Sequence, residues 1–344
     1  FYKDLFDKLD IDVQIIRHGK FKSAVEPFML KKMSVENREQ IKLLLNSFSN
    51  NLMDSIANQR KISLQTVQKH ADNLSLNSAK DCHKLKYVDE LFYQDQVEKI
   101  LLEICGNEKL NIISLNNYSK VASENKKKIS KNKIAIIYAT GTINSGKGDE
   151  NSIGSATTVK AIRKAVKDKN IKGIVFRVNS GGGSALASDI ILREVILAKQ
   201  EKPFVVSLGD YAASGGYYIA CAADSIIANP TTLTGSIGVF GMIPNLKTFY
   251  KNKLGINIDT VNTNKYSDIG VNRRLSEFER NKIQTQIEDI YDTFITRVSE
   301  GRSIDKSEVD KIGQGRVWSG YDAKKIGLVD VYGGLETAIN ITAS

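Results

Sequence analysis

Residues 172–216 read KGIVFRVNSGGGSALASDIILREVILAKQEKPFVVSLGDYAASGG, and this stretch decides the fold class. Two short runs rich in β-branched and other apolar residues, 172–179 and 203–210, are typical of buried strands. Between them, residues 184–200 carry apolar side chains at helical spacing. A strand, a helix and a second strand in this order predict a βαβ unit with parallel strands.

The same alternation extends toward the N-terminus of this stretch. The run KIAIIYATGTI from Lys133 predicts a further buried strand, and residues 155–169 predict a further helix. We therefore expect an α/β unit with a largely parallel sheet from about residue 133 onward.

An internal duplication relates the two ends of the chain. Three pairs of segments match in the same order: FYKDLFDKLD from Phe1 with FYKNKLGINI from Phe249, SVENREQI from Ser34 with SEFERNKI from Ser276, and LKYVDEL around Asp89 with IGLVDVY around Asp330. The first copy has no counterpart of the sheet-forming front half in this sequence, and we expect it to be truncated at its N-terminus. We predict the back half of a first copy at 1–105, a linker at 106–132 and a second copy at 133–344.

The matched back halves each predict a long helix with a serine cap. Ser276 and Glu279 form a capping-box pattern, and Ser34 occupies the equivalent position in the first copy. Apolar residues at helical spacing predict one buried stripe on each helix. The stripes comprise Ile283, Ile287, Ile290, Phe294 and Val298 in the second copy, and Ile41, Leu44, Leu45 and Phe48 in the first.

Composition narrows the function classes. The 344 residues are 41% hydrophobic and carry a net charge of +10, but the lysines are scattered. The only dense lysine run, within 126–133, precedes a strand, which favours a solvated linker over a nucleic-acid patch. Cys82, Cys105 and Cys221 lack CxxC spacing, so neither a disulfide framework nor a zinc site is predicted. No apolar run is long enough to span a bilayer, and a start without Met leads us to expect a trimmed part of a longer protein.

Two glycine-rich stretches could carry chemistry. The loop NSGGGSALAS (179–188) can present backbone N–H groups to an oxyanion or a phosphate, or its glycines can simply serve tight turns. In AASGGYYIACAA, Ser214 directly follows a predicted strand. It is either a small packing residue or a nucleophile at a strand-to-helix turn, with the Gly215 N–H as an oxyanion donor.

A base for Ser214 is not obvious. The three histidines, His18, His70 and His83, all lie in the first copy. Lys22 lies in the same copy beside apolar residues and could act as the base if burial lowered its pKa by roughly three units. Otherwise it is an exposed lysine, as most lysines are. In the second copy, Ser236 within NPTTLTGSIGVFG either closes a turn or orients a catalytic amine.

The duplication favours the catalytic interpretation of this lysine. Lys22 aligns with Ser267, so the second copy lacks the amine, while the first copy lacks a counterpart of Ser214. Each copy could thus contribute what the other lacks.

Four motifs occur in an order that resembles the signal peptide peptidase A family, bacterial membrane-bound serine proteases of the long, duplicated type. They are GKFKSAVEPF, VNSGGGSALAS, GDYAASGGYYIA and NPTTLTGSIGVFG. The resemblance implies duplicated Clp protease/crotonase-like α/β units. It also implies Ser214 as nucleophile, Lys22 as general base, Ser236 as the lysine-orienting residue, and Gly182 and Gly215 as oxyanion donors. One departure is Gly181, where the family usually carries proline.

The resemblance further implies peptide substrates such as signal peptides, with no metal or organic cofactor and no nucleic-acid partner. It implies a homo-oligomer, a tetramer in the family, at the bacterial cytoplasmic membrane. The catalytic part would face the exported side, held by an N-terminal anchor absent from this chain. A narrow apolar pocket near Ile219, Leu233 and Val239 would suit aliphatic side chains.

Two alternatives of other classes stay open. A crotonase-type acyl-CoA enzyme would also use a glycine-loop oxyanion hole, but its carboxylates would have to be Asp189 and Glu194. A non-catalytic, membrane-associated scaffold could retain an old active site.

Overall fold

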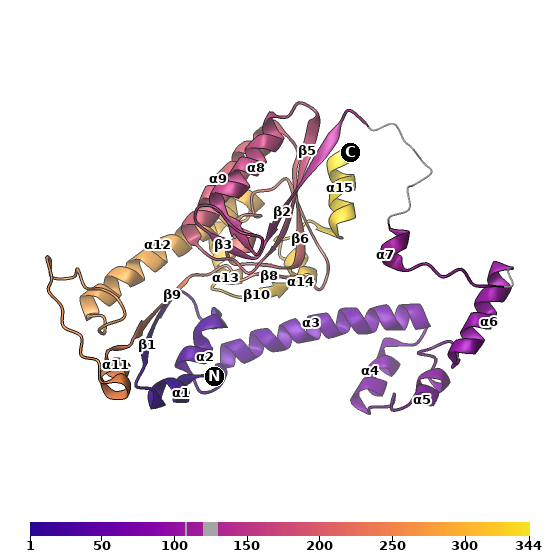
Figure 1. Cartoon of the computed structure of the whole chain (residues 1–344), viewed down its shortest axis with the longest axis horizontal. Helices are drawn as coiled ribbons and strands as arrows, with labels where there is room; N and C mark the ends of the chain where they lie inside the picture. Colours follow the sequence, from indigo (N-terminus) through magenta and orange to yellow (C-terminus); the bar gives the residue numbers. More distant parts are fainter. Residues whose placement is uncertain (107–108, 120–129) are drawn as a thin grey trace. The chain divides into compact units, whose positions relative to one another are not determined.

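The computed structural model describes residues 1–106, 109–119 and 130–344 (Figure 1). These residues form two compact units, one made of 1–48 with 132–344 and the other of 49–131. All five candidate site residues belong to the first unit. The division into compact units does not test the predicted boundaries between the two copies, which stay a prediction.

A largely parallel sheet forms the centre of the first unit, as predicted. Its strands are β2 (Lys133–Thr140), β5 (Ile171–Ser180), β6 (Phe204–Ala213), β7 (Ser225–Ala228), β8 (Leu233–Gly235), β10 (Val317–Ser319) and β11 (Val331–Tyr332). Strand β6 is central: β5 pairs with one edge, and β7 and β8 pair in turn with the other edge, all in parallel. Only β10, beside β8, runs antiparallel within the described sheet.

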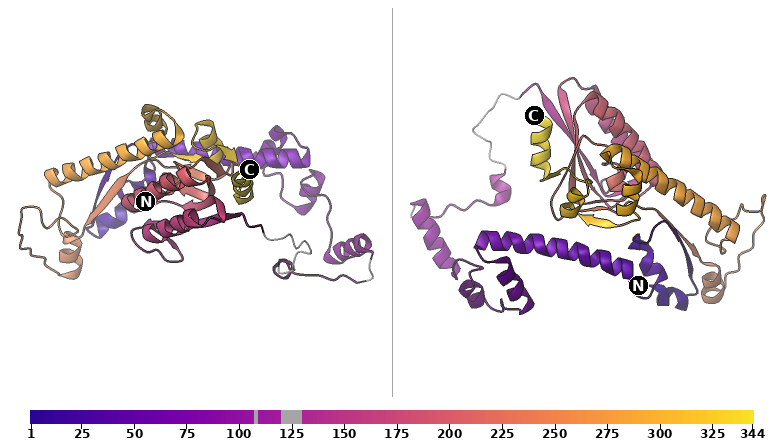
Figure 2. Two further views of the ribbon diagram at one scale, coloured as in Figure 1. Left: turned by 90° about the horizontal axis from the view of Figure 1, so that it is seen from above. Right: turned by 180° about the vertical axis from the view of Figure 1, so that it is seen from behind.

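Helices cover both faces of this sheet (Figures 1 and 2). The helices α8 (Ser155–Lys167) and α9 (Ala185–Glu201) lie on one face, and α15 (Leu335–Ala343) lies on the other. Because strand side chains alternate, neighbouring residues of β5 serve different cores. Phe176 belongs to the large core under α9, whereas Val175 packs with Ala338 of α15.

The strand at Lys133 forms, but the prediction that it is buried is wrong. Strand β2 is the last strand of the described sheet on its side, and its burial is incomplete because no strand covers that edge. Ile136 is 38% exposed and Tyr138 is 64% exposed. The chain then enters a small parallel pair, β3 (Thr142–Asn144) and β4 (Ser152–Gly154).

The N-terminal segment attaches to the rest of the first unit through a strand pair. Strand β1 (Asp12–Arg17) runs antiparallel to β9 (Phe240–Asn245), with Arg17 opposite Phe240. Ile16 is buried between the pair and α12 (Glu277–Arg302), where it contacts a cluster that includes Leu275 and Ile287. Around β1 lie α1 (Lys3–Lys8), η1 (Ser23–Val25), α2 (Glu26–Met29) and the start of α3 (Val35–Arg60).

The two long helices support the predicted duplication. Helices α3 and α12 are both 26 residues long and follow the matched serines. The hydroxyl of Ser34 accepts from the Asn37 N–H at 3.0 Å, and Ser276 with Glu279 forms the predicted capping box. The stripes are confirmed in part: Phe294 and Val298 are buried, Ile290 is 37% exposed, and Leu45 is 59% exposed because it lies one step around α3 from buried Leu44.

The remaining helices of the first unit are α10 (Gly215–Tyr218), α11 (Lys247–Leu254), α13 (Lys306–Ile312) and α14 (Gly320–Lys325). The second unit contains the end of α3 and the helices α4 (Leu64–Asp72), α5 (Ala79–Lys84), α6 (Gln94–Cys105) and α7 (Leu115–Tyr118). Part of the predicted linker, including Lys126, Lys127 and Lys128, lies outside the described residues. Across the described ranges, no helix combines the length and hydropathy that crossing a bilayer requires.

Replacing Ile16 by Ala tests the attachment of β1. Ile16 is 1% exposed, so the change removes buried methyl groups and should lower the free energy of unfolding by about 2–4 kcal/mol. Urea unfolding measures this loss. The control Leu5→Ala removes a side chain that is 51% exposed and should cost less than about 0.5 kcal/mol. Equal losses in the two variants would contradict the described packing.

Candidate functional site

Ser214 lies at the turn from β6 into α10. Its φ of +52° and ψ of −123° form a conformation that residues with a Cβ rarely adopt. The turn is held by two backbone bonds, from Ser214 N–H to the Gly235 carbonyl and from Tyr218 N–H to the Ser214 carbonyl, both 2.9 Å. Strain of this kind is typical of a nucleophile elbow, which projects a hydroxyl from the end of a sheet.

The glycines after Ser214 allow α10 to pack closely against the sheet. A Cβ on Gly216 would lie 2.3 Å from the Ser180 carbonyl oxygen, and one on Gly215 would lie 2.7 Å from the Ser188 hydroxyl. Positions 215 and 216 of α10 therefore need glycine, because a side chain at either would clash with a neighbouring segment. This close approach holds the N-terminus of α10 beside the loop 180–184.

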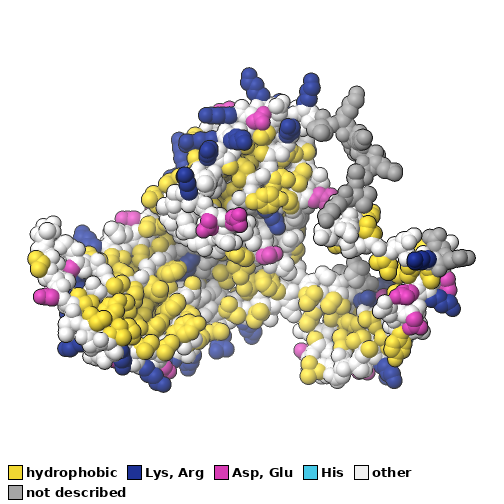
Figure 3. Space-filling model, viewed as in Figure 1, with side chains coloured by type: hydrophobic (Ala, Val, Ile, Leu, Met, Phe, Trp, Pro, Cys, Tyr) yellow, Lys and Arg dark blue, Asp and Glu magenta, His cyan; other side chains and the backbone are white. Residues whose placement is uncertain are grey.

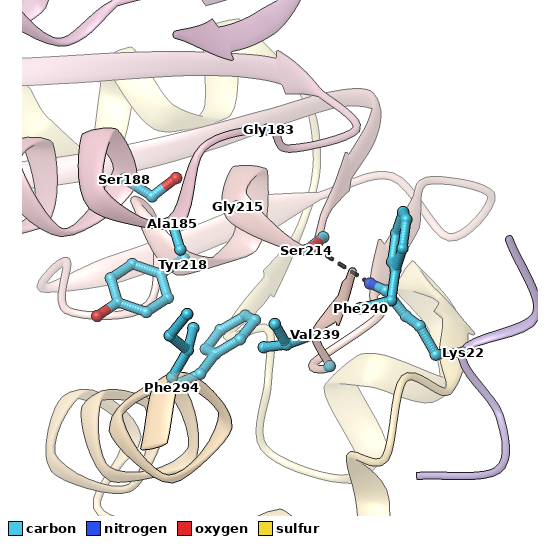
Figure 4. A pocket seen from close by; sticks show the side chains of 12 residues that line it. Lys22, Gly183, Ala185, Ser188, Ser214, Gly215, Tyr218, Val239, Phe240 and Phe294 are labelled. Carbon is cyan, nitrogen blue, oxygen red and sulfur yellow. Dashed lines mark hydrogen bonds between the residues drawn. The ribbon is translucent and has the colours of Figure 1, made fainter. Parts of the chain in front are cut away.

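Lys22 reaches Ser214 from the loop that follows β1 (Figure 4). Its Nζ lies 3.2 Å from Ser214 Oγ, 2.9 Å from Ser236 Oγ and 3.0 Å from the Ser236 carbonyl oxygen. Three residues that are distant in sequence thus meet at one amine. The structure brings together Lys22, Ser214 and Ser236, the trio singled out in the sequence.

Burial makes this amine unusual. Lys22 is 4% exposed, and desolvation lowers its pKa from 10.5 to about 8. No carboxylate of the described residues forms an ion pair with Nζ, so nothing of opposite charge offsets the cost of protonation. A substantial fraction of the amine is therefore neutral in mildly alkaline solution, and it can accept a proton from a neighbouring hydroxyl.

The glycine loop offers backbone donors next to Ser214. The Gly182 N–H donates to Ser180 Oγ at 3.1 Å and is therefore engaged within the loop. Gly183 forms a parallel bridge with Ile143, in which the bonds to Ile143 use the Gly182 carbonyl and the Ser184 N–H. In such a bridge the N–H of Gly183 itself points away from Ile143. Gly183, with Gly215, lines the cavity at Ser214.

The sequence analysis named Gly182 as an oxyanion donor and did not name Gly183, which lines the cavity. Three consecutive glycines look alike in a sequence, and only the bridge to β3 distinguishes Gly183, whose N–H points away from Ile143. Gly182 is needed for a different reason, because any side chain at this position would clash with the Ser214 turn. A Cβ there would lie 2.6 Å from the Gly215 nitrogen and 3.0 Å from Ser214 Cβ.

A cavity of about 240 Å³ opens beside Ser214 and Lys22. Its apolar wall comes from three elements: Tyr218 of α10, Val239 before β9, and Ile290 and Phe294 of α12 (Figure 4). Of the three residues expected around a pocket, only Val239 lines it. Ile219 is fully buried in the core.

The surface next to the cavity is also apolar. Phe240, which lines the cavity, is 41% exposed, and Met242 further along β9 is 43% exposed. Figure 3 shows hydrophobic side chains gathered over the part of the molecule that holds α1, β1 and β9. The apolar lining of the cavity therefore continues onto the exposed surface of β9.

The histidines have other partners. His18 pairs with Glu288, and its ring stacks on Tyr291 with the centroids 3.7 Å apart. His70 and His83 belong to the unit of residues 49–131, where they contact Tyr87 and Glu90. No histidine is a hydrogen-bond partner of Ser214 within the described part of the chain.

The carboxylates near the glycine loop are also engaged. Asp189 accepts from the Tyr218 hydroxyl at 2.7 Å, and Glu194 pairs with Arg163 at 2.9 Å. Neither lines the cavity at Ser214. Within the described ranges, no three metal-binding side chains of the His, Cys, Asp and Glu types gather at one place.

The buried amine should make stability depend on pH. Below about pH 8 both the folded and the unfolded state bind the Lys22 proton, and the folded state bears the full desolvation cost. Between about 8 and 10.5 only the unfolded state keeps this proton, so stability rises with pH over that window. From pH 7 to 9.5 the wild type should gain about 2 kcal/mol relative to Lys22→Met.

Urea unfolding of the wild type and Lys22→Met at both pH values measures this difference. Lys20→Met is a matched control, because Lys20 is exposed two residues away and should follow the wild type at every pH. Parallel stability curves for the wild type and Lys22→Met would show that the amine keeps its ordinary pKa.

Comparison with known proteins adds a family to this geometry. The chain matches Peptidase family S49 over residues 1–103 and 196–344. It is 37% identical to Protease 4 of Haemophilus influenzae, over 99% of this chain and 57% of that protein. It is 34% identical to the chloroplastic serine protease SPPA of Arabidopsis thaliana, over 99% of this chain and 52% of that protein. The chain thus spans somewhat more than half the length of these relatives.

Among solved structures, a ClpP1 mutant from Listeria monocytogenes is similar with a TM-score of 0.41 and 15% identity, over 59% of this chain and 94% of that one. The family match extends over both ends of the chain and includes the segments that carry Lys22, Ser214 and Ser236. The resemblance noted in the sequence is confirmed, and the chain belongs to Peptidase family S49.

Proposed function

We propose that this chain is the catalytic part of a serine endopeptidase that uses Ser214 as nucleophile and Lys22 as general base. The observation that carries the proposal is the 3.2 Å contact between the Ser214 hydroxyl and an amine that is almost completely buried. Membership of a peptidase family supports the reaction class. A hydroxyl beside a neutral amine is one of the ways in which a serine is activated.

The reaction begins with proton transfer. Neutral Lys22 takes the proton of Ser214 as the Oγ attacks the scissile carbonyl carbon, and the carbonyl oxygen becomes an oxyanion. The N–H groups of Gly183 and Gly215 stabilise that charge, and Gly183 takes this role in preference to Gly182, whose N–H is engaged by Ser180. Protonated Lys22 then donates to the leaving amine, and the C–N bond breaks.

Hydrolysis of the acyl-enzyme uses the same groups in reverse. Lys22, neutral again, takes a proton from a water molecule that attacks the ester carbon, and Ser214 Oγ leaves with the proton from Lys22. The Ser236 hydroxyl and carbonyl accept hydrogen bonds from Nζ throughout and keep it directed at Ser214. This gives Ser236 the role of a positioning residue for the base.

The cavity and the family resemblance support the substrate class that we propose. Apolar walls formed by Val239, Ile290 and Phe294 suit a peptide with apolar side chains next to the scissile bond. Signal peptides released after secretion have such side chains, and we propose them as substrates at the exported face of the cytoplasmic membrane. A homo-oligomer, as in the family, belongs to the same proposal.

The alternative of an acyl-CoA enzyme has less support. Its carboxylates would be Asp189 and Glu194, but these are held by Tyr218 and Arg163 and do not line the cavity. A thioester that bound without acylating Ser214 would favour this alternative nonetheless.

Labelling with a fluorophosphonate, followed by peptide mass mapping, tests the nucleophile and base. The wild type should be labelled at Ser214, Ser214→Ala should not be labelled, and Lys22→Met should react at least a hundredfold more slowly. Lys20→Met is the matched lysine control and should react like the wild type. Labelling that persists in Lys22→Met would remove the lysine from its role, and a folded wild type without labelling would favour a non-catalytic scaffold.

The pH dependence of labelling tests the ionisation. Because the neutral amine is the active form, the rate should rise with pH and level off above the Lys22 pKa of about 8. At pH 6 the rate should be about a hundredfold below the plateau, since one pH unit changes the neutral fraction tenfold. A profile centred near 6.5 that His18→Gln abolished would instead assign the base to histidine.

A further inference from the structure

A short backbone segment lies directly against Lys22. Residues 313–317, which we call the docking loop, run from the end of α13 into the first residue of β10. Two of its residues have positive φ, +52° at Gln314 and +84° at Gly315. The sequence analysis gave this segment no function, and none of its residues takes part in the reaction proposed above.

The docking loop contacts both sides of the amine site. On one side, the N–H of Phe21, the residue before Lys22, donates to the Gln314 carbonyl at 3.1 Å. On the other side, Gly315 N–H donates to the Ile237 carbonyl and Ser236 N–H donates to the Arg316 carbonyl, both at 2.7 Å. One loop therefore fixes the spacing between the lysine and the serine that receives its hydrogen bonds.

The contact between Gly315 and Lys22 leaves no room for a side chain. A Cβ on Gly315 would lie 2.6 Å from the N, the Cα and the Cβ of Lys22. Gly238 closes the slot from another direction, because a Cβ there would lie 2.6 Å from Gly315 Cα and 3.3 Å from Lys22 Cδ. The stem of Lys22 is thus held between two glycine backbones, which also exclude water from it.

Side chains fasten the lysine segment to this loop. The Gln40 amide of α3 donates to the Phe21 carbonyl at 3.0 Å, and its oxygen accepts from the Val317 N–H at 3.3 Å. The Arg316 guanidinium stacks 3.8 Å above the Phe21 ring. Gln40 is 2% exposed. If its side chain were replaced by an apolar one, the Phe21 carbonyl and the Val317 N–H would each lose a hydrogen-bond partner that water cannot replace.

The charged groups around Lys22 belong to three elements. Arg17 and Glu26 lie on its own segment, where Arg17 donates to the Lys22 carbonyl at 3.1 Å and the buried carboxylate of Glu26 accepts from Ser34 and Asn37. Arg316 lies on the docking loop, and Glu288 of α12 pairs with His18. None of them is bonded to Nζ, so the environment of the amine is set by packing and by its uncharged partners Ser214 and Ser236.

We propose that Gly315 is a positioning residue for the general base, and that the docking loop sets the depth at which Lys22 lies beside Ser214 and Ser236. The inference rests on the proposed function for the role of Lys22 as base. The placement of its amine can be measured without any turnover.

The test measures the reactivity of the Lys22 amine in the full chain. Acetic anhydride acylates neutral amines, so the extent of Lys22 acetylation as a function of pH, mapped by mass spectrometry, reports the ionisation of Nζ. The measurement uses a Ser214→Ala background to keep the serine from reacting. The cavity lined by Lys22 admits the small reagent.

Gly315→Ala should displace Lys22 and admit water to its amine. The midpoint of acetylation should move from about 8 toward 10.5. Labelling of Ser214 by fluorophosphonate, in the chain with the serine restored, should fall at least tenfold at pH 7, because each unit of pKa lowers the neutral fraction tenfold. The plateau at high pH should fall as well, since a displaced amine no longer faces the hydroxyl.

Gly327→Ala is the matched control. Gly327 has nearly the same φ, +80°, but a Cβ there meets only the flexible end of Ile304, at 3.2 Å. Both variants therefore strain the backbone similarly, and only Gly315→Ala contacts Lys22. The control should keep the midpoint of the parent chain.

A milder variant covers the case in which Gly315→Ala does not fold. Gln40→Met keeps the volume but removes the link between Phe21 and Val317, and it should move the midpoint in the same direction. An unchanged midpoint in the folded variants, or an equal shift in Gly327→Ala, would overturn the inference. A wild type whose Ser214 does not react would refute the proposed function, while the acetylation profile would still report on the docking loop.

Discussion

The pairing of β1 with β9 is the constraint on which the candidate site depends. It carries the loop of Lys22 across 192 positions of sequence and places its amine beside Ser214. The pair has one buried side, where Ile16 packs against α12, and a register shift by one residue would turn Ile16 outward. The hydrophobic contact and the position of the amine are therefore set together.

The site also depends on a balance between desolvation and hydrogen bonding. A buried amine without an opposite charge destabilises the folded chain at neutral pH, and its pKa of about 8 expresses that cost. The hydroxyls of Ser214 and Ser236 and the Ser236 carbonyl each accept a hydrogen bond from Nζ. They satisfy the donors of the amine without supplying a negative charge, which would stabilise the protonated form. Hydroxyl and carbonyl partners thus let the lysine stay buried with a lowered pKa, so that its neutral form can act as a base.

Much of this arrangement could be predicted from the sequence. Strand and helix periodicity gave the parallel sheet, and the duplication with the motif at Ser214 pointed to Lys22. Contacts between distant backbones could not be predicted. The proposed preference for Gly183 over Gly182 as oxyanion donor depends on the bridge to Ile143, and the exposure of Ile136 depends on which strand ends the sheet. The role of Ile290 and Phe294 as cavity walls could not be predicted either, because it depends on how α12 packs beside the cavity.

The docking loop joins the residues that the two predicted copies contribute to the candidate site. In the predicted duplication, the second copy supplies Ser214, Ser236 and the loop, while its own counterpart of Lys22 is Ser267. The first copy supplies the amine, and Phe21 and Gln40 fasten its segment to the loop. Gly315 and Gly238 leave a slot that is filled by the backbone and stem of Lys22, a residue of the other predicted copy. A duplicated chain can therefore assign the hydroxyl and the amine to different copies, provided that one copy retains glycines where the other must enter.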